Sequence, residues 1–515
     1  MLAKVYSLGI FGLEAYPVTI EVDVSHALPA TVIVGLPDNA VKESKERVRS
    51  AIKNSGYQFP AQRITVNLSP ADTKKEGPSF DLPIALGLLA ATQQTNSSSL
   101  AKFVVLGELS LDGQIQPIHG ALPMALAVPK NQFRGLMLPA ANAAEAALQE
   151  DIKVYPVKTL QETINVIQNP EGVTPFQIKA PFAERMISPG EVDFSDVKGQ
   201  WLAKRALEIA AAGGHNVLMI GPPGSGKTML AQRLPTILPD MTQEESLETT
   251  KIHSVMGLLP SQGGLMTSRP FRSPHHTSSD IALVGGGSLP KPGEITLAHN
   301  GVLFLDELPE FDRNVLEALR QPLEDHHVTV SRINKTIRFP SQFMLVAAMN
   351  PCLCGQYGNP RVPCRCSSMQ IQRYRSKISG PLLDRIDIHL DVPAVSYQEL
   401  STTRPAETSQ GIKARVNHTR AVQKERFSAG REKGEDIFCN AQMTHRQVRK
   451  FCVLGKEESE LLKMAMTELN FSARAYDKIL KVSRTIADLA ASPEIKTEHL
   501  AEAIQYRSLD RDWWG

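Results

Sequence analysis

The residues with the clearest chemical meaning in this sequence are Gly221-Pro222-Pro223-Gly224-Ser225-Gly226-Lys227-Thr228. Glycines at this spacing let successive backbone N–H groups turn toward phosphate oxygens, while a lysine supplies charge for the β- and γ-phosphates and a hydroxyl can bind Mg²⁺. An apolar strand expected at Asn216–Ile220 enters the segment, and a helix expected from Met229 leaves it. The segment therefore predicts a phosphate loop for ATP with Mg²⁺, with Thr228 as a magnesium ligand; the alternative is a chance glycine turn.

Hydrolysis also needs two carboxylates near the phosphates, one to hold magnesium and one to polarise water. Val302-Leu303-Phe304-Leu305-Asp306-Glu307 supplies both at the end of an apolar strand. We expect Asp306 to orient Mg²⁺ and Glu307 to act as the base toward the attacking water. The alternative is a pair of acidic residues that only begin a helix, where such side chains are also favoured.

A third apolar strand, expected at Phe343–Ala348, is followed by Asn350. An amide at the end of such a strand can hold water or the γ-phosphate, so Asn350 is a candidate sensor. An asparagine before Pro351 is also a common turn residue, and this alternative stays open.

The order of these elements, with Leu382-Leu383-Asp384-Arg385-Ile386-Asp387 and Ser472-Ala473-Arg474 downstream, resembles AAA+ proteins of the magnesium-chelatase and replicative-helicase branch. The resemblance implies that Arg385 is an arginine finger for the γ-phosphate of a neighbouring subunit and that Arg474 is the sensor of a helical lid. A finger acting in trans requires a ring of subunits. The alternative for each arginine is a surface ion pair.

The segment between the phosphate loop and Asp306 contains Arg269–Thr277 and Gly285-Gly286-Gly287, and it resembles the second-helix insert of that branch. Two adjacent histidines, His275 and His276, diverge by about 100° on a helix and point to opposite faces of a strand. We therefore expect polar contacts from them rather than a metal pair.

In Val328–Arg338, apolar and polar residues alternate on either side of Asn334. This pattern predicts a β-hairpin with basic residues near its tip. In related ring helicases such a hairpin enters the pore. Arg332 and Lys335 could then grip a DNA phosphate backbone without base preference. A solvated basic hairpin with no ligand is an equally weighted alternative.

Cys352-Leu353-Cys354 and Cys364-Arg365-Cys366 form two cysteine pairs separated by a loop. Four thiolates grouped in this way could hold one tetrahedral Zn²⁺ through Cys352, Cys354, Cys364 and Cys366. The CxC spacing is tighter than the commoner CxxC spacing, so a metal-free cluster stays open. Cys439 and Cys452 are expected to be small buried residues.

The whole chain, at 515 residues, is too long for a single core, and its composition is that of an ordinary globular protein. A net charge of +2 provides no strong global field, so any nucleic-acid binding must use local basic patches. No export signal or membrane-length apolar stretch is present, which predicts a cytoplasmic protein without a membrane partner.

Composition and periodicity predict an α/β multidomain protein. We expect an α/β domain over residues 1–170, a proline-rich linker over 171–196, a P-loop α/β/α core with the insert over 197–395, and a C-terminal helical lid over 396–515. The resemblance given above implies an AAA+ fold for the core, and the motifs Glu76–Ser79 and Gly107–Gly113 imply by resemblance a Lon/S5-like fold for the first domain.

Within the first domain, Glu76-Gly77-Pro78-Ser79 and Gly107–Gly113 resemble the proteolytic domain of Lon proteases. In that family a serine attacks the peptide after a lysine has removed its proton. Ser79 matches the serine, but Leu122 stands where the family has its lysine. The domain is therefore expected to be inactive as a protease and to serve as a platform for oligomerisation or nucleic acid.

Taken together, these features resemble the bacterial ComM/YifB family of magnesium-chelatase-like AAA+ proteins over nearly the entire chain. The resemblance implies a hexameric, ATP-dependent DNA helicase that promotes branch migration of recombination intermediates during natural transformation, with recombination proteins as partners. One alternative is a protein-remodelling motor of the magnesium-chelatase type, whose motor subunits lack a Lon-like first domain. The other is an ATP-dependent protease, which needs a substitute for the missing lysine.

Overall fold

The computed structural model describes residues 2–178, 192–259, 264–287, 290–332, 335–359, 362–395, 406–428, 437–469 and 471–507. The chain divides into two compact units. The first holds residues 1–185, 243–266 and 288–291, and the second holds 186–242, 267–287 and 292–515. The expected linker at 171–196 is described only at its two ends, so the domain boundaries given above stay predictions.

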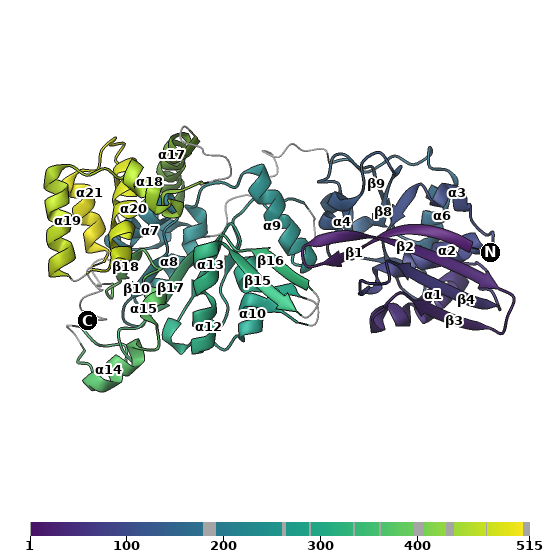
Figure 1. Cartoon of the computed structure of the whole chain (residues 1–515), viewed down its shortest axis with the longest axis horizontal. Helices are drawn as coiled ribbons and strands as arrows, with labels where there is room; N and C mark the ends of the chain where they lie inside the picture. Colours follow the sequence, from purple (N-terminus) through teal and green to yellow (C-terminus); the bar gives the residue numbers. More distant parts are fainter. Residues whose placement is uncertain are drawn as a thin grey trace. The chain divides into compact units, whose positions relative to one another are not determined.

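A seven-stranded sheet organises the first unit, in the order β3-β4-β2-β1-β5-β8-β9. The strands are β1 (Leu2–Phe11), β2 (Glu14–Ser25), β3 (Ala30–Val34), β4 (Arg63–Ser69), β5 (Phe103–Val105), β8 (Gly135–Pro139) and β9 (Val154–Val157). β2 pairs antiparallel with both β1 and β4, and the remaining neighbours are parallel. Alternate residues of β2 are buried, as a strand with one face on the core requires. Figure 1 shows β1 and β2 running side by side.

Helices cover this sheet, and the short strands β6 (Glu108–Leu109) and β7 (Ile115–Gln116) pair beside it. The helices are α1 (Asn39–Asn54), α2 (Asp81–Ala91), α3 (Ser97–Leu100), α4 (Ala121–Ala127), α5 (Ala143–Ala146) and α6 (Leu160–Gln168), with 3₁₀ turns η1 (Pro78–Phe80) and η2 (Ala140–Asn142). The alanine-rich segment 140–150 forms only η2 and α5. Asn142 bonds both backbone groups of Ile118, so tertiary contacts override helix propensity there.

The first unit also contains α9 (Gln243–Val255), which comes from the insert of the motor sequence. The backbone N–H of Gly120 donates to the carbonyl of Ser254 at 2.9 Å. Lys251 Nζ lies 2.6 Å from Glu14 Oε1, and Ser254 Oγ donates to Glu145. These contacts attach the C-terminal half of α9 to the first unit.

A five-stranded parallel sheet organises the second unit, in the order β11-β14-β17-β10-β18. The strands are β10 (Val217–Ile220), β11 (Phe271–Arg272), β14 (Val302–Leu305), β17 (Met344–Met349) and β18 (Ile388–Asp391). β10, β14 and β17 are buried along their whole length, the pattern of parallel strands covered on both faces. The carboxyl ends of β10, β14 and β17 therefore meet at one edge of the sheet.

The helices of this core begin with α7 (Trp201–Gly213) and α8 (Lys227–Arg233). The remaining elements before residue 395 are η4 (Phe194–Asp196), η5 (Leu234–Thr236), α10 (Asp280–Val284), β12 (Gly285–Gly286), β13 (Lys291–Pro292), α11 (Glu294–Leu297), η6 (Leu308–Glu310), α12 (Arg313–Ala318), α13 (Arg320–Asp325), β15 (His327–Arg332), β16 (Lys335–Pro340), α14 (Ser368–Arg375) and α15 (Gly380–Leu383).

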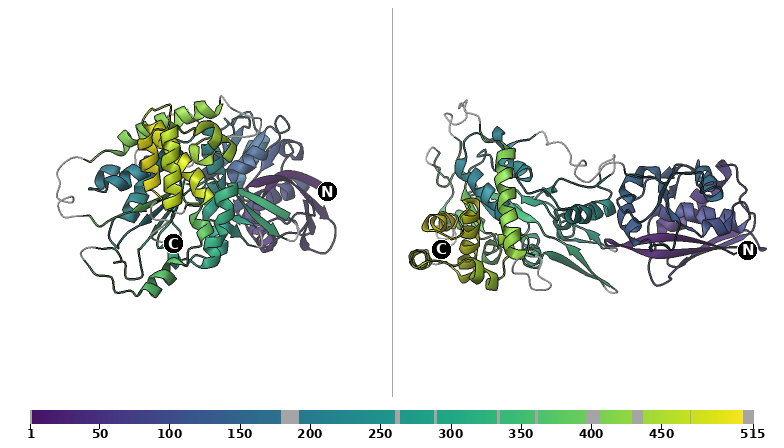
Figure 2. Two further views of the ribbon diagram at one scale, coloured as in Figure 1. Left: turned by 60° about the vertical axis from the view of Figure 1, so that its left-hand side comes forward. Right: turned by 90° about the horizontal axis from the view of Figure 1, so that it is seen from above.

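The C-terminal helices form one group, seen in yellow and green in Figures 1 and 2. They are α17 (Ser409–Ser428), α18 (His445–Phe451), α19 (Lys456–Glu468), α20 (Ala473–Leu489) and α21 (Thr497–Gln505), with the 3₁₀ turn η7 (Asn440–Gln442). One face of α20 is apolar and buried, through Ile479, Val482 and Ile486. These side chains share one hydrophobic cluster with the sheet, so the lid and the core pack as one body in this structure.

No helix among the described residues is both long and apolar enough to cross a bilayer.

A buried carboxylate, Asp387, ties three parts of the second unit together. Lys478 Nζ on α20 lies 2.6 Å from Asp387 Oδ1, and the backbone N–H of Asn216, just before β10, donates to Oδ2 at 2.9 Å. His215 Nδ1 lies 3.6 Å from Oδ2. Burial opposes ionisation of Asp387, but the charge of Lys478 and the contact with His215 prevail and hold the pKa of Asp387 well below its usual range.

We expect Asp387→Ala to lower the free energy of unfolding by about 3 kcal/mol, because it leaves the partly buried Lys478 ammonium and the backbone N–H of Asn216 without their partner. Denaturant unfolding of the full chain measures this. Adding Lys478→Met to Asp387→Ala should recover part of the loss, since both charges are then absent. A double variant less stable than Asp387→Ala alone would contradict this account.

Candidate nucleotide-binding site

The loop between β10 and α8 has a backbone that only glycine adopts without strain. Gly224 has φ +75° and Gly226 has φ +90°, both in the left-handed region. A Cβ on Gly221 would lie 2.1 Å from the carbonyl oxygen of Val392, so the start of the loop also requires glycine. The sequence pattern at 221–228 therefore corresponds to a tight loop that leads directly into a helix, the arrangement that binds phosphate.

Lys227, the first residue of α8, is almost fully buried. Its Nζ donates to the carbonyls of Gly221 at 2.7 Å and Pro222 at 3.0 Å, and it lies 3.4 Å from Asn350 Oδ1. Burial lowers the pKa of Lys227, while the nearby charges of Asp306 and Glu307 act in the opposite direction. A buried ammonium held by neutral oxygens fits an anionic ligand, because a phosphate oxygen is a stronger partner than a carbonyl.

Thr228 and Asp306 meet across the edge of the sheet. Thr228 Oγ1 donates to Asp306 Oδ2 at 2.7 Å, and the backbone N–H of Glu307 donates to Oδ1 at 2.9 Å. A hydroxyl and a carboxylate in contact are the oxygen donors that Mg²⁺ prefers. The two predicted magnesium ligands are therefore together and fit the ion.

Glu307 sits in a strained backbone conformation, with φ +53° in the left-handed region. Such a conformation costs a non-glycine residue about 1–2 kcal/mol and persists where the surroundings impose it, often at functional sites. The carboxylate is half exposed, and its Oε2 lies 3.5 Å from His276 Nδ1. An accessible carboxylate beside Asp306 is well placed to activate water.

His276 belongs to the pair for which we expected polar contacts. Its ring centroid lies 4.1 Å from that of His275, and His275 Nδ1 lies 2.9 Å from Thr277 Oγ1. The contact of His276 with Glu307 joins the insert to the predicted catalytic base, which sequence spacing did not reveal.

Asn350 follows the last residue of β17 and faces Lys227. Because β17 pairs directly with β10 in parallel, the residue after β17 lies beside the phosphate loop. The structure thus brings together five predicted site residues: Lys227, Thr228, Asp306, Glu307 and Asn350.

Gln200, which the sequence did not single out, supports the loop from the other side. It adopts φ +56°, and its Nε2 donates to the carbonyls of Ser225 at 3.2 Å and Pro393 at 2.7 Å. A glutamine before a helix carries no local pattern that would predict this contact, since its partners are distant in sequence.

The side-chain partners that the structure gives Arg385 and Arg474 lie outside the phosphate loop. Arg385 Nη2 lies 2.5 Å from Glu324 Oε1, and Nη1 donates to the carbonyl of Pro381 at 2.5 Å. Arg474, in the first turn of α20, lies 3.7 Å from Asp384 Oδ2 and is largely exposed. The ion pairs we weighed as alternatives are thus present, and the finger and sensor roles stay predictions.

The predicted hairpin is formed by β15 and β16, which pair antiparallel from His327 with Pro340 to Arg332 with Lys335. The two basic residues therefore face each other at the turn end of the ladder. Their side chains lie outside the described residues, so DNA contact through Arg332 and Lys335 stays a prediction.

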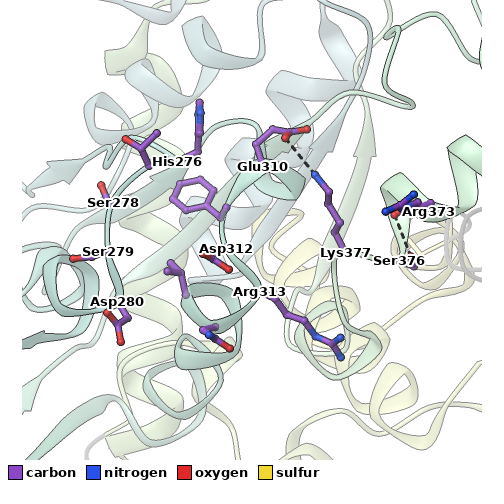
Figure 3. Close-up of a pocket in the computed structure, with 14 residues that line it drawn as sticks. His276, Ser278, Ser279, Asp280, Glu310, Asp312, Arg313, Arg373, Ser376 and Lys377 are labelled. Carbon is purple, nitrogen blue, oxygen red and sulfur yellow. Dashed lines mark hydrogen bonds and ion pairs between the residues drawn. The ribbon is translucent and has the colours of Figure 1, made fainter.

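A cavity of about 950 Å³ lies beside the site, between the insert, η6 with α12, and the end of α14 (Figure 3). Lys377 crosses it toward Glu310 at 3.3 Å, with Arg313 and Arg373 nearby. Its lining includes His276 but no residue of the phosphate loop. The cavity is therefore separate from the predicted phosphate position.

The four clustered cysteines are brought to one point. Cys352 Sγ lies 3.4 Å from Cys354 Sγ and 3.6 Å from Cys364 Sγ, Cys354 and Cys364 are 3.5 Å apart, and all four sulfurs including Cys366 fall within 4.8 Å of one another. A disulfide would need about 2.05 Å, whereas thiolates at about 2.3 Å from one tetrahedral ion would be about 3.8 Å apart. The geometry therefore fits a metal site.

Backbone N–H groups of Arg365 and Gln356 donate to Cys354 and lower the pKa of its thiol to about 6. For Cys364 and Cys366 a backbone hydrogen bond acts to lower the pKa, but burial and then the contacts with the other cysteines outweigh it and raise the pKa of both thiols. Crowded thiols that resist joint ionisation are what a cation would stabilise. Cys439 and Cys452 are buried, as expected.

In the first unit, Leu122 is fully buried, and its backbone N–H donates to Glu145 Oε1 at 2.8 Å. Ser79 is partly buried beside α2, and its carbonyl accepts from the N–H of Gly107 at 2.9 Å. The position that matches the Lon lysine therefore serves the apolar core.

Comparison with known proteins matches three family models. They are magnesium chelatase, subunit ChlI, at residues 193–400; subunit ChlI of Mg-chelatase at 20–142; and magnesium chelatase, subunit ChlI C-terminal, at 406–507.

Individual relatives extend this likeness to the full chain. It is 46% identical to the "Competence protein ComM" of Haemophilus influenzae, over 99% of this chain and 98% of that protein. It is 43% identical to the "Uncharacterized protein YifB" of Escherichia coli over the same shares. A further 141 residues, 27% of this chain and 25% of the relative, are 27% identical to "Lon protease 2" of Bacillus subtilis, in accord with a Lon-like first domain.

Glu307→Gln should slow ATP turnover by about 100-fold or more, because the amide cannot take the proton of the attacking water, while ATP binding persists. Phosphate release and binding of a fluorescent ATP analogue measure the two effects. Glu310→Gln is the matched control, since Glu310 lies three positions along and pairs with Lys377 instead. Turnover in Glu307→Gln within tenfold of the unmodified chain would contradict the assignment.

Proposed function

The chain belongs to the ComM/YifB family of magnesium-chelatase-like AAA+ proteins, and from this membership we propose that it is an ATP-driven motor acting on branched DNA. The observation that carries the proposal is the convergence of Lys227, Thr228, Asp306, Glu307 and Asn350 at one edge of the parallel sheet. This set supplies every group that ATP hydrolysis requires from one subunit.

In this site Lys227 releases its carbonyl partners and binds the β- and γ-phosphates, while the glycine loop supplies backbone N–H donors. Mg²⁺ held through Thr228 and Asp306 neutralises charge on the phosphates when bound. Glu307 accepts the proton of the attacking water, and Asn350 orients that water or the γ-phosphate.

We propose that the active form is a ring, by family likeness a hexamer, in which Arg385 serves the site of the neighbouring subunit. Its described partners are Glu324 and Pro381 rather than its own phosphate loop. The Glu324 carboxylate is half exposed and can be hydrated when Arg385 turns to a phosphate, although the arginine itself is largely buried in this structure. Arg474 on α20 would couple nucleotide binding to the lid.

DNA as the substrate is supported by the hairpin and by family likeness. The hairpin places two basic residues opposite each other at its turn, where a phosphate backbone in a central pore could be gripped. The competence protein named among the relatives points to the uptake of DNA, and branch migration of recombination intermediates during natural transformation is the activity we propose. Recombination proteins are the partners this activity would need.

A protein-remodelling motor is the second candidate, because three magnesium-chelatase models match the chain. It would show ATPase activity stimulated by a protein and indifferent to DNA. A protease is disfavoured by the buried Leu122 at the lysine position.

We propose Zn²⁺ as the ion of the four-cysteine cluster. Tetrahedral all-sulfur sites hold zinc or iron–sulfur clusters. The sulfur–sulfur distances of 3.4–3.6 Å suit a single ion.

Branched DNA should stimulate the ATPase of the full chain, and ATP should drive separation of the branches. The double variant Arg332→Ala with Lys335→Ala should bind DNA more weakly, with a shallower dependence on salt by about 0.7–0.9 per lost phosphate contact. Fluorescence anisotropy over a salt series measures this. Lys456→Ala, an exposed lysine at the start of α19, is the control. An assembled ring that neither responds to DNA nor separates branches would overturn the DNA proposal.

Lys227→Ala and Arg385→Ala should each be inactive alone, yet equal mixing should restore about a quarter of the sites, since an intact loop then meets an intact finger by chance. ATPase assays on mixtures assembled from dissociated subunits measure this. Mixing Lys227→Ala with Glu307→Gln is the control and should restore nothing. No recovery in the first mixture would place Arg385 outside the neighbour's site.

A further inference from the structure

The four-cysteine loop touches the phosphate loop directly. Gly355, between the two cysteine pairs, has φ +74°, and a Cβ there would lie 2.5 Å from Cδ and 2.8 Å from Cγ of Pro223. Pro223 belongs to the phosphate loop, so the two loops are in contact where only glycine fits. A shift of the cysteine loop would therefore move Pro223 or leave it unsupported.

The same loop also begins at the predicted sensor. Cys352 is two positions after Asn350, with Pro351 between them. Nε and Nη2 of Arg375, at the end of α14, donate to the carbonyl of Pro351 at 3.4 Å. The guanidinium of Arg375 also lies 4.9 Å from the ring centroid of Tyr357. The loop thus contacts the nucleotide site at two places, Asn350 and Pro223.

Apolar burial within the loop is too small to hold these contacts. Leu353, Tyr357 and Val362 are all exposed, whereas Cys352 is fully buried and its sulfur accepts from the N–H of Tyr357 at 3.3 Å. A segment with so little buried apolar surface needs another source of order. The converging thiols are that source if they bind an ion, because a structural zinc contributes folding free energy directly.

We propose that Zn²⁺ bound by Cys352, Cys354, Cys364 and Cys366 acts as a brace that holds Pro223 and Asn350 in position for ATP. This inference rests on the proposed ATPase function. Each Zn–S bond forms as a thiol gives its proton to solvent, so no oxidant or reductant is required. The zinc takes no part in hydrolysis and acts through the phosphate loop and the sensor.

The sharpest test compares Gly355→Ala with Gly358→Ala in the full chain. Both glycines have positive φ, +74° and +76°, but a Cβ on Gly358 meets nothing within 4 Å. The two variants therefore share the backbone strain and differ in the contact with Pro223. We expect Gly355→Ala to lower kcat/KM for ATP by about tenfold or more relative to Gly358→Ala, chiefly by raising KM.

The zinc content of both variants separates an effect on the phosphate loop from an effect on the metal site. About one zinc per chain in each would show that Gly355→Ala acts on the phosphate loop and not on the metal site. Equal kcat/KM in the two variants would contradict the proposal that the cysteine loop positions Pro223. If the unmodified chain fails to hydrolyse ATP, the proposed function is wrong. Comparing the two variants by binding of a fluorescent ATP analogue then still tests whether the cysteine loop positions Pro223.

Removal of the metal supplies the second test. Chelation or Cys354→Ser should raise KM for ATP, and adding Zn²⁺ should rescue the chelated protein but not the variant. Cys452→Ser, a buried cysteine outside the cluster, controls for loss of a thiol. A metal-free chain with unchanged KM, or iron in place of zinc in the purified protein, would overturn the proposal.

Discussion

The buried charge of Asp387 is the constraint on which the arrangement of the second unit depends. A carboxylate removed from water must be compensated, and here Lys478 on α20 and the backbone N–H of Asn216 provide the compensation. The first partner belongs to the lid and the second precedes β10, the strand that carries the phosphate loop. Asp387 itself follows Arg385 by two positions. One ion pair therefore fixes the lid, the phosphate loop and the predicted finger segment relative to one another.

This constraint gives the proposed motor a route for transmitting nucleotide state. Arg474 begins the same helix that carries Lys478, and Asp384, its partner, lies next to Arg385. A movement of the lid would therefore act on the segment that holds Arg385, the predicted finger, because the Asp387 carboxylate is buried and its pair with Lys478 resists separation.

The first unit includes a segment that comes from the motor sequence. Residues 243–266 leave the motor sequence, pack in the first unit through α9, and return. The chain thus passes between the two units repeatedly, and α9 is attached through Gly120, Glu14 and Glu145. In this Lon-like domain the position of the family's lysine is taken by the buried Leu122, so the apolar core is present without the serine–lysine pair.

The sequence by itself determined the phosphate loop, the carboxylates Asp306 and Glu307, the strands that carry them and the helical lid, because glycine spacing and apolar runs are local properties. Tertiary structure alone decided which distant groups meet: Gln200 under the loop, His276 beside Glu307, Asp387 with Lys478, and Gly355 against Pro223. These contacts join residues far apart in the chain, and no local pattern encodes them. The four cysteines stand between the two cases, since their types suggested a metal and only the fold brought the four sulfurs within 4.8 Å of one another.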